Sequence, residues 1–483
     1  MLPLIPLPRS VRVREDAYRL TVGTRLRGVP EVVAAMLRER TGLSLEGGEP
    51  AAVEFRLGAH GQPESYRLEV DATGVRVEAP DDAGLFYAGC TLIQLLGHDR
   101  DGWSVAGATI EDVPRFKYRG AMLDVARHFF DLAIVKRLVD QIAGLKLNVL
   151  HLHLSDDQGW RIEIVSRPAL TALAAGSGVG GGPGGYYTQA DYAELVRYAA
   201  ARQVTIVPEI DLPGHTHAVG VAYPELVEHP AFNLRTLAMI LGTDRVMPRA
   251  GRPFTGMGVG FSSLRLDHEL SYDFVADVLG ELAALTPGPY LHIGGDECLG
   301  TRPEAYAGFL RRSTALVAGL GKTPMAWHEA GVVSGLAAGT VGQYWGFLAP
   351  DRTAADCVRR LTEQGSKLVL SPADAVYLDM KPDRASPLGR DWIGGPITLE
   401  GAYRWDPSDL ISAVAEDDIL GVEAPLWTEL VTSPAQIDAL MFPRIAAIAE
   451  ISWSARRGEP GRDWPGFRTR LEGLPSLWTG VGG

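Results

Sequence analysis

The chain has 483 residues, of which 46% are hydrophobic, and its formal net charge is −13. This length predicts two or three domains, since domains commonly run to about 100–200 residues. The acidic balance argues against a nucleic-acid partner and against an anionic membrane surface, because both present phosphates that require a basic face. It is compatible with a neutral partner such as a sugar.

The cysteines and the N-terminal residues bear on the cellular compartment. The three cysteines, Cys90, Cys298 and Cys357, show no CxxC spacing, so they predict neither a disulfide framework nor a zinc cluster. Their odd number favours a reducing compartment. The N-terminal sequence MLPLIPLPRSVRVRED does not resemble a signal peptide, and no apolar run approaches the roughly 18 residues of a membrane span. We therefore expect a soluble protein, cytoplasmic in preference to secreted.

The first part of the chain predicts a small α/β accessory domain over residues 1–112. Residues 66–78 alternate in polarity around the turn Asp71-Ala72-Thr73-Gly74, which is typical of a β-hairpin. A helix is predicted over residues 83–96. A linker at residues 111–115 follows, because Pro114 disfavours helix in the residue before it.

From residue 118 onward, strand-like segments alternate with helical ones. Asp131 and Thr188 are placed to cap two of these helices, and further helices are predicted over residues 272–285 and 434–450. Repeated strand–helix units predict a parallel sheet closed into a (β/α)8 TIM barrel, over residues 113–483 with C-terminal helices. The eight predicted strands are 118–125, 147–155, 204–210, 291–294, 323–327, 340–345, 367–370 and 419–424.

Polar or aromatic residues follow nearly every predicted barrel strand. Each acidic residue taken alone could be a helix cap, but recurrence at successive strand ends favours an active site, since such barrels carry it at the C-terminal face. The residues at these ends include Asp124, Arg127, Asp156, Asp157, Glu209, Asp211, His215, Asp296, Glu297, Trp327, Trp345, Tyr377, Asp379, Trp427 and Glu429.

The neighbouring carboxylates Asp296 and Glu297 suit glycoside chemistry, which needs one carboxyl group kept protonated. A neighbouring carboxylate raises the pKa of its partner, because two like charges resist joint ionisation. Adjacent residues of a strand point to opposite faces, so both reach one site only if the strand ends there, which Gly294-Gly295 would permit.

Several stretches resemble glycoside hydrolase family 20, the β-N-acetylhexosaminidases, and above all its actinobacterial members. They are RGAMLDVARHFF, LNVLHLHLSDDQGWRI, GGGPGGYYT, VPEIDLPGHTHA, LHIGGDE, QYWG, SPADAVYLDM and EAPLWTE. The resemblance implies a retaining exo-enzyme that removes terminal β-linked GlcNAc or GalNAc. It also implies substrate-assisted catalysis, in which the 2-acetamido oxygen attacks the anomeric carbon and an oxazolinium ion forms.

The same resemblance implies roles for individual residues. Glu297 would be the acid and base, Asp296 and Tyr377 would hold the acetamido group, and Asp156 and His215 would tune Glu297. The implied substrate-binding residues are Arg127, Trp327, Trp345, Asp379, Trp427, Glu429 and Asp211. The resemblance implies no metal and no cofactor.

Two features depart from the family pattern. Cys298 directly follows the catalytic pair, where a small residue is expected, and we interpret it as a buried small side chain. Residues 229–260 match no family pattern, and we interpret them as a mobile loop on the leaving-group side of the site.

Two other functions fit parts of the sequence. His151, His153, Glu209, His217 and His292 could serve a metal-dependent, amidohydrolase-like barrel. That hypothesis leaves the tryptophans and the GGDE sequence unexplained. A non-catalytic sugar-binding protein on the same barrel is the second alternative, because fold alone does not fix function. The presence of Asp296, Glu297 and Tyr377 argues against it.

Overall fold

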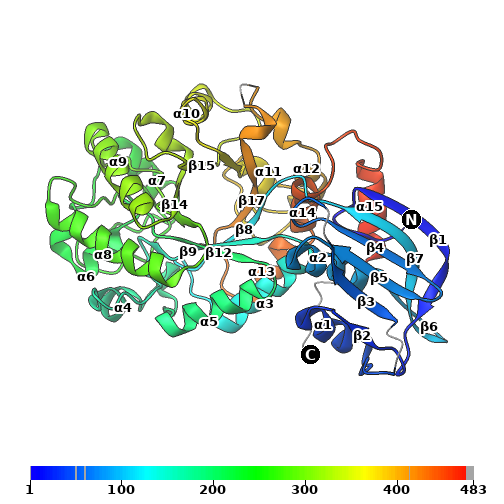
Figure 1. Ribbon diagram of the computed structural model, residues 1–483. Helices are drawn as coiled ribbons and strands as arrows, with labels where there is room; N and C mark the ends of the chain where they lie inside the picture. Colours follow the sequence, from blue (N-terminus) through cyan, green and yellow to red (C-terminus); the bar gives the residue numbers. More distant parts are fainter. Residues whose placement is uncertain (1, 49–51, 59–60, 413, 475–483) are drawn as a thin grey trace.

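The computed structural model describes residues 2–48, 52–58, 61–412 and 414–474. Figure 1 shows an N-terminal sheet (blue to cyan) packed beside a larger barrel. The sheet has the order β1-β7-β4-β5-β3-β2, with β6 paired to β7. Its strands are β1 Ser10–Arg19, β2 Leu26–Arg27, β3 Val53–Leu57, β4 Tyr66–Asp71, β5 Gly74–Ala79, β6 Leu96–Asp99 and β7 Gly102–Asp112.

The predicted hairpin and helix of this domain are both present. Strands β4 and β5 pair antiparallel, with Asp71 opposite Gly74. Leu68 and Val70 of β4 are fully buried, as the alternating pattern requires. Helix α2, Asp82–Gln94, starts where the Asp81 side chain accepts a hydrogen bond from the Gly84 N–H. This helix packs on β3, β4 and β5, and α1, Glu31–Thr41, packs against α2.

The second domain is a closed barrel of parallel strands, which confirms the predicted fold class. The strands follow one another around the barrel in chain order, and each predicted strand overlaps the observed one. They are β8 Tyr118–Asp124, β9 Val149–His153, β12 Thr205–Glu209, β13 Tyr290–His292, β14 Thr323–Trp327, β15 Val341–Tyr344, β16 Leu368–Leu370 and β17 Ile419–Leu426. A short ribbon, β10 Ser155–Asp156 and β11 Gly159–Trp160, follows β9.

The helices outside the barrel begin where their capping residues predict. Asp131 accepts from Ile134 N–H, and Thr188 forms a capping box with Asp191. The helices of this domain are α3 Leu132–Gly144, α4 Ala169–Ala174, α5 Gln189–Ala200, α6 His217–Ala222, α7 Leu234–Leu241, α8 Glu269–Leu285, α9 Pro303–Gly319, α10 Arg352–Glu363, α11 Ala373–Val376, α12 Leu399–Tyr403, α13 Pro434–Met441, α14 Arg444–Trp453 and α15 Trp464–Gly473.

Two predicted boundaries were wrong. The helix expected over residues 434–450 is two helices, α13 and α14, because Pro443 has no N–H to continue the first one. Glu111 and Asp112, expected in a linker, form the end of β7. Asp112 is buried against the second domain, where its carboxylate accepts from Lys146 Nζ at 2.9 Å and from Trp453 Nε1 at 3.0 Å.

The barrel interior has one apolar layer and one charged layer. Tyr118, Val149, Val207, Met325, Val341 and Val369 form the apolar layer. Towards the C-terminal ends of the strands the interior residues are His151, His153, Glu209, His292, Gln343 and Glu423, all fully buried. Aliphatic residues usually fill such barrels, so this second layer is unusual and has to be held by pairing its charges. No helix within the described residues is long and apolar enough to cross a membrane.

Candidate active site

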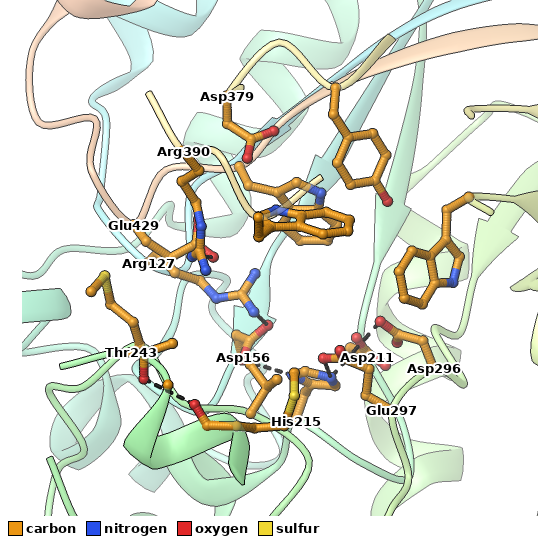
Figure 2. A pocket seen from close by; sticks show the side chains of 18 of the residues that line it. Arg127, Asp156, Asp211, His215, Thr243, Asp296, Glu297, Asp379, Arg390 and Glu429 are labelled. Carbon is orange, nitrogen blue, oxygen red and sulfur yellow. Dashed lines mark hydrogen bonds and ion pairs between the residues drawn. The ribbon is translucent and has the colours of Figure 1, made fainter. Parts of the chain in front are cut away.

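A cavity of about 460 Å³ opens at the C-terminal end of the barrel strands. Figure 2 shows polar side chains from several strands converging on it, with Asp296 and Glu297 on one side and Asp379, Arg390 and Glu429 on another. The lining residues are Arg127, Asp156, Asp211, His215, Ala238, Met239, Gly242, Thr243, Met257, Val259, Asp296, Glu297, Trp345, Tyr377, Asp379, Arg390, Trp392, Trp427 and Glu429. Every sequence-predicted site residue except Trp327 is among them.

The chain turns sharply after β13, which brings Asp296 and Glu297 to the same cavity. Gly294 and Gly295 have φ of 67° and 105°, values that side chains other than glycine rarely adopt. A Cβ on Gly294 would lie only 1.8 Å from Asp211 Oδ1. That oxygen accepts a hydrogen bond from Gly295 N–H at 3.2 Å. Asp211 thus holds the turn that the sequence predicted from the two glycines.

Glu297 has the electrostatic setting of a carboxylic acid. Its side chain is 22% exposed, and its Oε2 lies 3.6 Å from His215 Nε2. Burial is the main influence and, together with neighbouring Asp296, it raises the pKa of Glu297 to about 7, although His215 opposes the rise. Glu297 itself has a positive φ of 47°, so its backbone is held in an uncommon conformation.

Asp156 connects His215 to a guanidinium group. Its Oδ1 lies 3.1 Å from His215 Nδ1, and its Oδ2 lies 2.7 Å from Arg127 Nη2. Burial opposes ionisation of Asp156, but Arg127 and His215 outweigh it and hold its pKa well below the usual range. Asp156, Asp211 and Asp296 in turn raise the pKa of His215 well above normal, against burial. His215 is therefore a cation directed at Asp296 and Glu297.

The chain of contacts continues from Asp156 into the barrel. His153 Nε2 lies 2.7 Å from Asp156 Oδ2, and His153 Nδ1 lies 2.5 Å from Glu209 Oε2. Burial favours the neutral ring, but Glu209 and Asp156 raise the pKa of His153 to about 9. An imidazolium between two carboxylates therefore joins the site to the barrel core.

Glu209 is the centre of the buried charged layer. Its oxygens lie 3.1 Å from His151 Nε2 and 3.0 Å from His292 Nδ1. His151 Nδ1 reaches Glu423 Oε1 at 2.9 Å, and Glu423 Oε2 accepts from Tyr118 OH at 2.5 Å. Burial opposes ionisation of Glu209, but its surrounding histidines hold its pKa well below normal. The network thus runs from the apolar layer of the barrel up to Glu297.

Asp379, Glu429 and Arg390 form the polar end of the cavity. Arg390 Nη1 donates to Glu429 Oε1 at 2.7 Å. Burial and the charge of Glu429 raise the pKa of Asp379 to about 8. Asp379 Oδ1, Glu429 Oε2 and Arg127 Nε are buried and have no hydrogen-bond partner among the described residues. Because buried polar groups normally are paired, this end suits a ligand with several hydroxyl groups.

Aromatic rings form the floor and one wall. Trp427 lies under the Arg127 guanidinium, 4.9 Å from ring centroid to Cζ, and contacts Tyr377 at 6.4 Å between centroids. Trp327 does not line the cavity: it is buried behind Trp427, with the two centroids 6.0 Å apart. Trp345 Nε1 donates to both oxygens of Glu329, at 3.1 and 3.0 Å.

Three residues of the site were missed in the sequence. Arg390 and Trp392 lie in an irregular segment after β16, where no periodic pattern marks them. Glu329 follows the end of β14, and this position at a strand end could have identified it. Burial and the charge of Asp296 raise the pKa of Glu329 well above normal. Residues 229–260, interpreted as a mobile loop near the site, do line the cavity, but they hold helix α7.

Cys298 is a free thiol that packs against the catalytic turn. Its Sγ lies 3.2 Å from Asp296 O. Burial and the nearby Asp211 raise its pKa well above the ordinary thiol value. A thiol of this kind is poorly nucleophilic, but the side chain is only partly buried, whereas the sequence predicted a buried one.

Some of the histidines and carboxylates lie close enough to hold a metal ion. One such group is His151, Glu209 and His292, and others include His153, Asp156, Asp211 and His215. Their ligand atoms, however, already contact one another in the buried network. His217, the remaining residue of the metal hypothesis, lies elsewhere, with Nε2 2.8 Å from Arg252 O. Four of the five residues proposed for a metal site therefore meet at Glu209, and His217 does not.

A barrel with a carboxylate pair, a polar end and aromatic walls at its C-terminal face defines a sugar-cleaving enzyme. The family model "Glycosyl hydrolase family 20, catalytic domain" matches residues 116–305 and 299–456, and "Glycosyl hydrolase family 20, domain 2" matches residues 1–113. The chain belongs to glycosyl hydrolase family 20 and is a glycoside hydrolase.

Individual relatives agree with this family membership. A β-N-acetylhexosaminidase of Cellulomonas fimi is 40% identical over 90% of this chain and 83% of its own. A solved family 20 β-N-acetylglucosaminidase is 48% identical, with a TM-score of 0.91 over 99% of this chain and 97% of that one. The Streptomyces plicatus N-acetyl-β-hexosaminidase in complex with Thio-NAglucal is 43% identical, with a TM-score of 0.89 over 99% and 95%.

We predict that Gly294→Ala destabilises the protein and displaces the catalytic turn. The added Cβ would meet Asp211 Oδ1 at 1.8 Å, and φ is 67°. Strain and overpacking together should lower the free energy of unfolding by about 2–5 kcal/mol, measured by urea denaturation. Gly280→Ala is the control, since a Cβ there meets nothing within 4 Å. Equal stability of both variants would contradict the role given to Gly294.

Proposed function

We propose that the protein is a retaining exo-β-N-acetylhexosaminidase that releases terminal, non-reducing β-linked GlcNAc or GalNAc by substrate-assisted catalysis. The observation that carries this proposal is the protonated character of Glu297 beside Asp296, in a cavity with a hydroxyl-binding end. The named activities of the relatives in Cellulomonas fimi and Streptomyces plicatus support the same substrate class.

In the proposed first step, Glu297 donates its proton to the glycosidic oxygen as the bond to the anomeric carbon breaks. The substrate's acetamido oxygen forms the new bond to that carbon, which gives an oxazolinium ion. Asp296 accepts a hydrogen bond from the acetamido N–H and stabilises the positive charge that develops there. The buried Tyr377 hydroxyl donates a hydrogen bond to the acetamido oxygen. The methyl group of the acetamido group is enclosed by Trp345, by Trp427 and by Trp327, which lies behind Trp427.

In the second step Glu297, now ionised, removes a proton from water as the water attacks the anomeric carbon. The attack opens the oxazolinium ion and restores the β configuration. His215, held by Asp156, faces Glu297 and stabilises its ionised form between the steps. Asp211 supports the turn that carries the pair. Arg127, Asp379 and Glu429 bind the sugar hydroxyls, the Arg127 fork suiting a pair of vicinal hydroxyls.

We predict that Glu297→Gln lowers kcat/KM for N,N′-diacetylchitobiose by about 10²–10⁴-fold, because the variant loses its general acid and base. Release of GlcNAc measures the rate. With the p-nitrophenyl glycoside, the rate of the first step should fall less than it does with chitobiose, because that leaving group needs little protonation. Glu304→Gln, an exposed carboxylate at the start of α9, is the matched control and should behave as the wild type.

Incubation with EDTA distinguishes this proposal from the metal-dependent one. Activity that survives EDTA in the wild type, and is lost in Glu297→Gln, supports the acid–base role. Activity lost with EDTA alone would contradict it. Binding of GlcNAc without turnover of any β-GlcNAc or β-GalNAc substrate would favour the sugar-binding alternative.

Fluorination of the acetamido methyl group tests substrate assistance. Fluorine withdraws electrons from the carbonyl oxygen and weakens it as a nucleophile. We therefore predict that kcat/KM falls steeply as zero, one, two and three fluorine atoms are introduced into a β-GlcNAc glycoside of fixed leaving group. The same rate along the series would mean that an enzyme carboxylate, not the substrate, attacks the anomeric carbon.

The pKa of Glu297 predicts the alkaline limit of activity. Its value of about 7 lies above the ordinary value, so the carboxyl is protonated below pH 7 and ionised above it. Because the first step needs the protonated form, kcat/KM for chitobiose should be lost as pH rises through about 7, at roughly tenfold per pH unit. Asp156→Asn removes a carboxylate beside His215 and should move this limit. An alkaline limit identical in both proteins would contradict the coupling.

A further inference from the structure

A buried arginine contacts the chain on both sides of Asp379. Arg444, the first residue of α14, is only 2% exposed. Its guanidinium donates five hydrogen bonds, and every acceptor is a main-chain carbonyl. The acceptors are Leu440 O at 3.1 Å from Nε and 2.6 Å from Nη2, Met380 O at 2.9 Å and Ile397 O at 3.2 Å from Nη1, and Leu378 O at 2.6 Å from Nη2. The fixed fork of donors in arginine thus holds two segments that are far apart in the sequence.

Packing alone does not explain an arginine at this position. Buried arginines are normally paired with carboxylates, whereas this one is bonded to neutral carbonyls. Burial lowers the pKa of Arg444 to about 10, and Asp379 opposes that change, so the side chain is a cation at neutral pH. Leu440 lies in the last turn of α13, whose negative end favours a cation. A hydrophobic side chain of similar volume would fill the site without burying a charge, which indicates that the hydrogen bonds themselves matter.

Three of the hydrogen bonds from Arg444 go to an irregular segment between α11 and α12. Leu378 and Met380 lie on either side of Asp379, and both are fully buried. They lie outside the helices and the barrel strands. A buried carbonyl needs a hydrogen-bond donor, and Arg444 supplies one to each of these two residues. One guanidinium group therefore fixes the backbone of Asp379 from both sides.

Asp379 is in turn connected to the rest of the polar end of the cavity. Its carbonyl oxygen accepts from Arg390 N–H at 2.8 Å, and Arg390 Nη1 donates to Glu429 Oε1 at 2.7 Å. Figure 2 shows Asp379, Arg390 and Glu429 in succession along one side of the cavity. Leu378 N–H donates to Pro425 O of β17 at 2.8 Å, which joins the same stretch to the barrel. A shift of this backbone would therefore move the Asp379 carboxyl group relative to its neighbours in the cavity.

We propose that Arg444 is a positioning residue for the sugar-binding end of the site, and that it acts through Asp379. Arg444 does not line the cavity, whereas Asp379 does, so the influence of Arg444 on the substrate passes through the backbone that it holds. Hydrogen bonds weaken steeply as their distance and angle depart from the optimum, so a displaced Asp379 carboxyl group would bind the sugar less tightly. This inference rests on the proposed function, because that proposal assigns Asp379 to the sugar hydroxyls.

Arg444→Lys separates the geometry of the guanidinium group from its charge. Lysine keeps the positive charge, but its single ammonium group cannot replace the fork that reaches Leu378 O, Met380 O and Ile397 O at once. We predict that kcat/KM for the p-nitrophenyl β-GlcNAc glycoside falls by about tenfold or more, since a small displacement of a positioned group can cost up to about 10²-fold. This substrate has a good leaving group, which keeps slow variants measurable.

A double-mutant cycle with Asp379→Ala determines whether Arg444 acts through Asp379. The alanine variant lacks the carboxyl group that Arg444 positions. Arg444→Lys should therefore lower kcat/KM by less than about threefold in the Asp379→Ala protein, against about tenfold or more in the wild type. Residues that act through one another depart from additivity in this way, whereas independent residues give the same loss in both backgrounds.

Arg470→Lys is the matched control. Arg470 of α15 is also 2% exposed and also donates to main-chain carbonyls, to Leu4 O at 3.0 Å and to Gly461 O at 3.4 Å. It pairs with Glu450 and does not line the cavity. Thermal unfolding followed by circular dichroism should show a loss of stability comparable to that of Arg444→Lys, because both variants leave buried carbonyls without donors. At a temperature where both variants are folded, Arg470→Lys should change kcat/KM by less than about twofold in either background.

A wild-type value of kcat/KM in Arg444→Lys would overturn the inference. So would an equal loss in the wild-type and Asp379→Ala backgrounds, since Arg444 would then act on the fold as a whole. If the lysine variant does not fold, Arg444→Gln takes its place in the cycle, because its amide still donates two hydrogen bonds. Failure of both variants to fold, where Arg470→Lys folds, would make Arg444 a folding residue and would also overturn the inference. Failure of the proposed function looks different: the wild type would release nitrophenol from neither the β-GlcNAc nor the β-GalNAc glycoside.

Discussion

The pairing of buried charges inside the barrel is the constraint on which the site depends. Glu209 is fully buried, and His151, His153 and His292 surround its two oxygens. Removing one partner from such a group would leave an unpaired charge in the interior, at a cost of about 3–5 kcal/mol. Strands β9, β12, β13 and β17 are therefore joined on the barrel axis by side chains as well as by their backbone ladders.

The same network sets the opposite protonation states that glycoside chemistry requires. Asp156 stays ionised because Arg127 and His215 outweigh its burial. Glu297 stays protonated up to neutral pH because burial and Asp296 outweigh the attraction of His215. A single imidazolium, His215, thus lies between one carboxylate that it fixes in the ionised form and one whose proton it can help to release.

The cavity combines two kinds of surface. Its Asp379–Arg390–Glu429 end presents buried atoms that are unpaired among the described side chains, as a polyhydroxylated ring would require. Its α7 wall presents methionine and aliphatic side chains.

The sequence by itself determined the barrel and most of the site. The periodicities of strands and helices, and the caps at Asp131 and Thr188, involve residues that are close together in the sequence. They can therefore be recognised without the tertiary structure. The site residues followed because barrel topology brings all strand ends to one face. Pro443, which divides the last long helical pattern, was also a local signal but was not used.

Only the tertiary structure decided which interactions these residues make. Trp327 lies behind Trp427 instead of lining the cavity, because ring packing depends on neighbours from distant strands. Arg390 pairs with Glu429, Glu329 pairs with Trp345, and Trp392 lies beside Tyr377, and no sequence pattern links these segments. Residues 229–260 were expected to match no family pattern, but the family model covers them, and their wall forms through contacts of Ile240 with Phe254 and Phe261. Periodicity reports which face of an element is apolar, but it does not report which surface that face will meet.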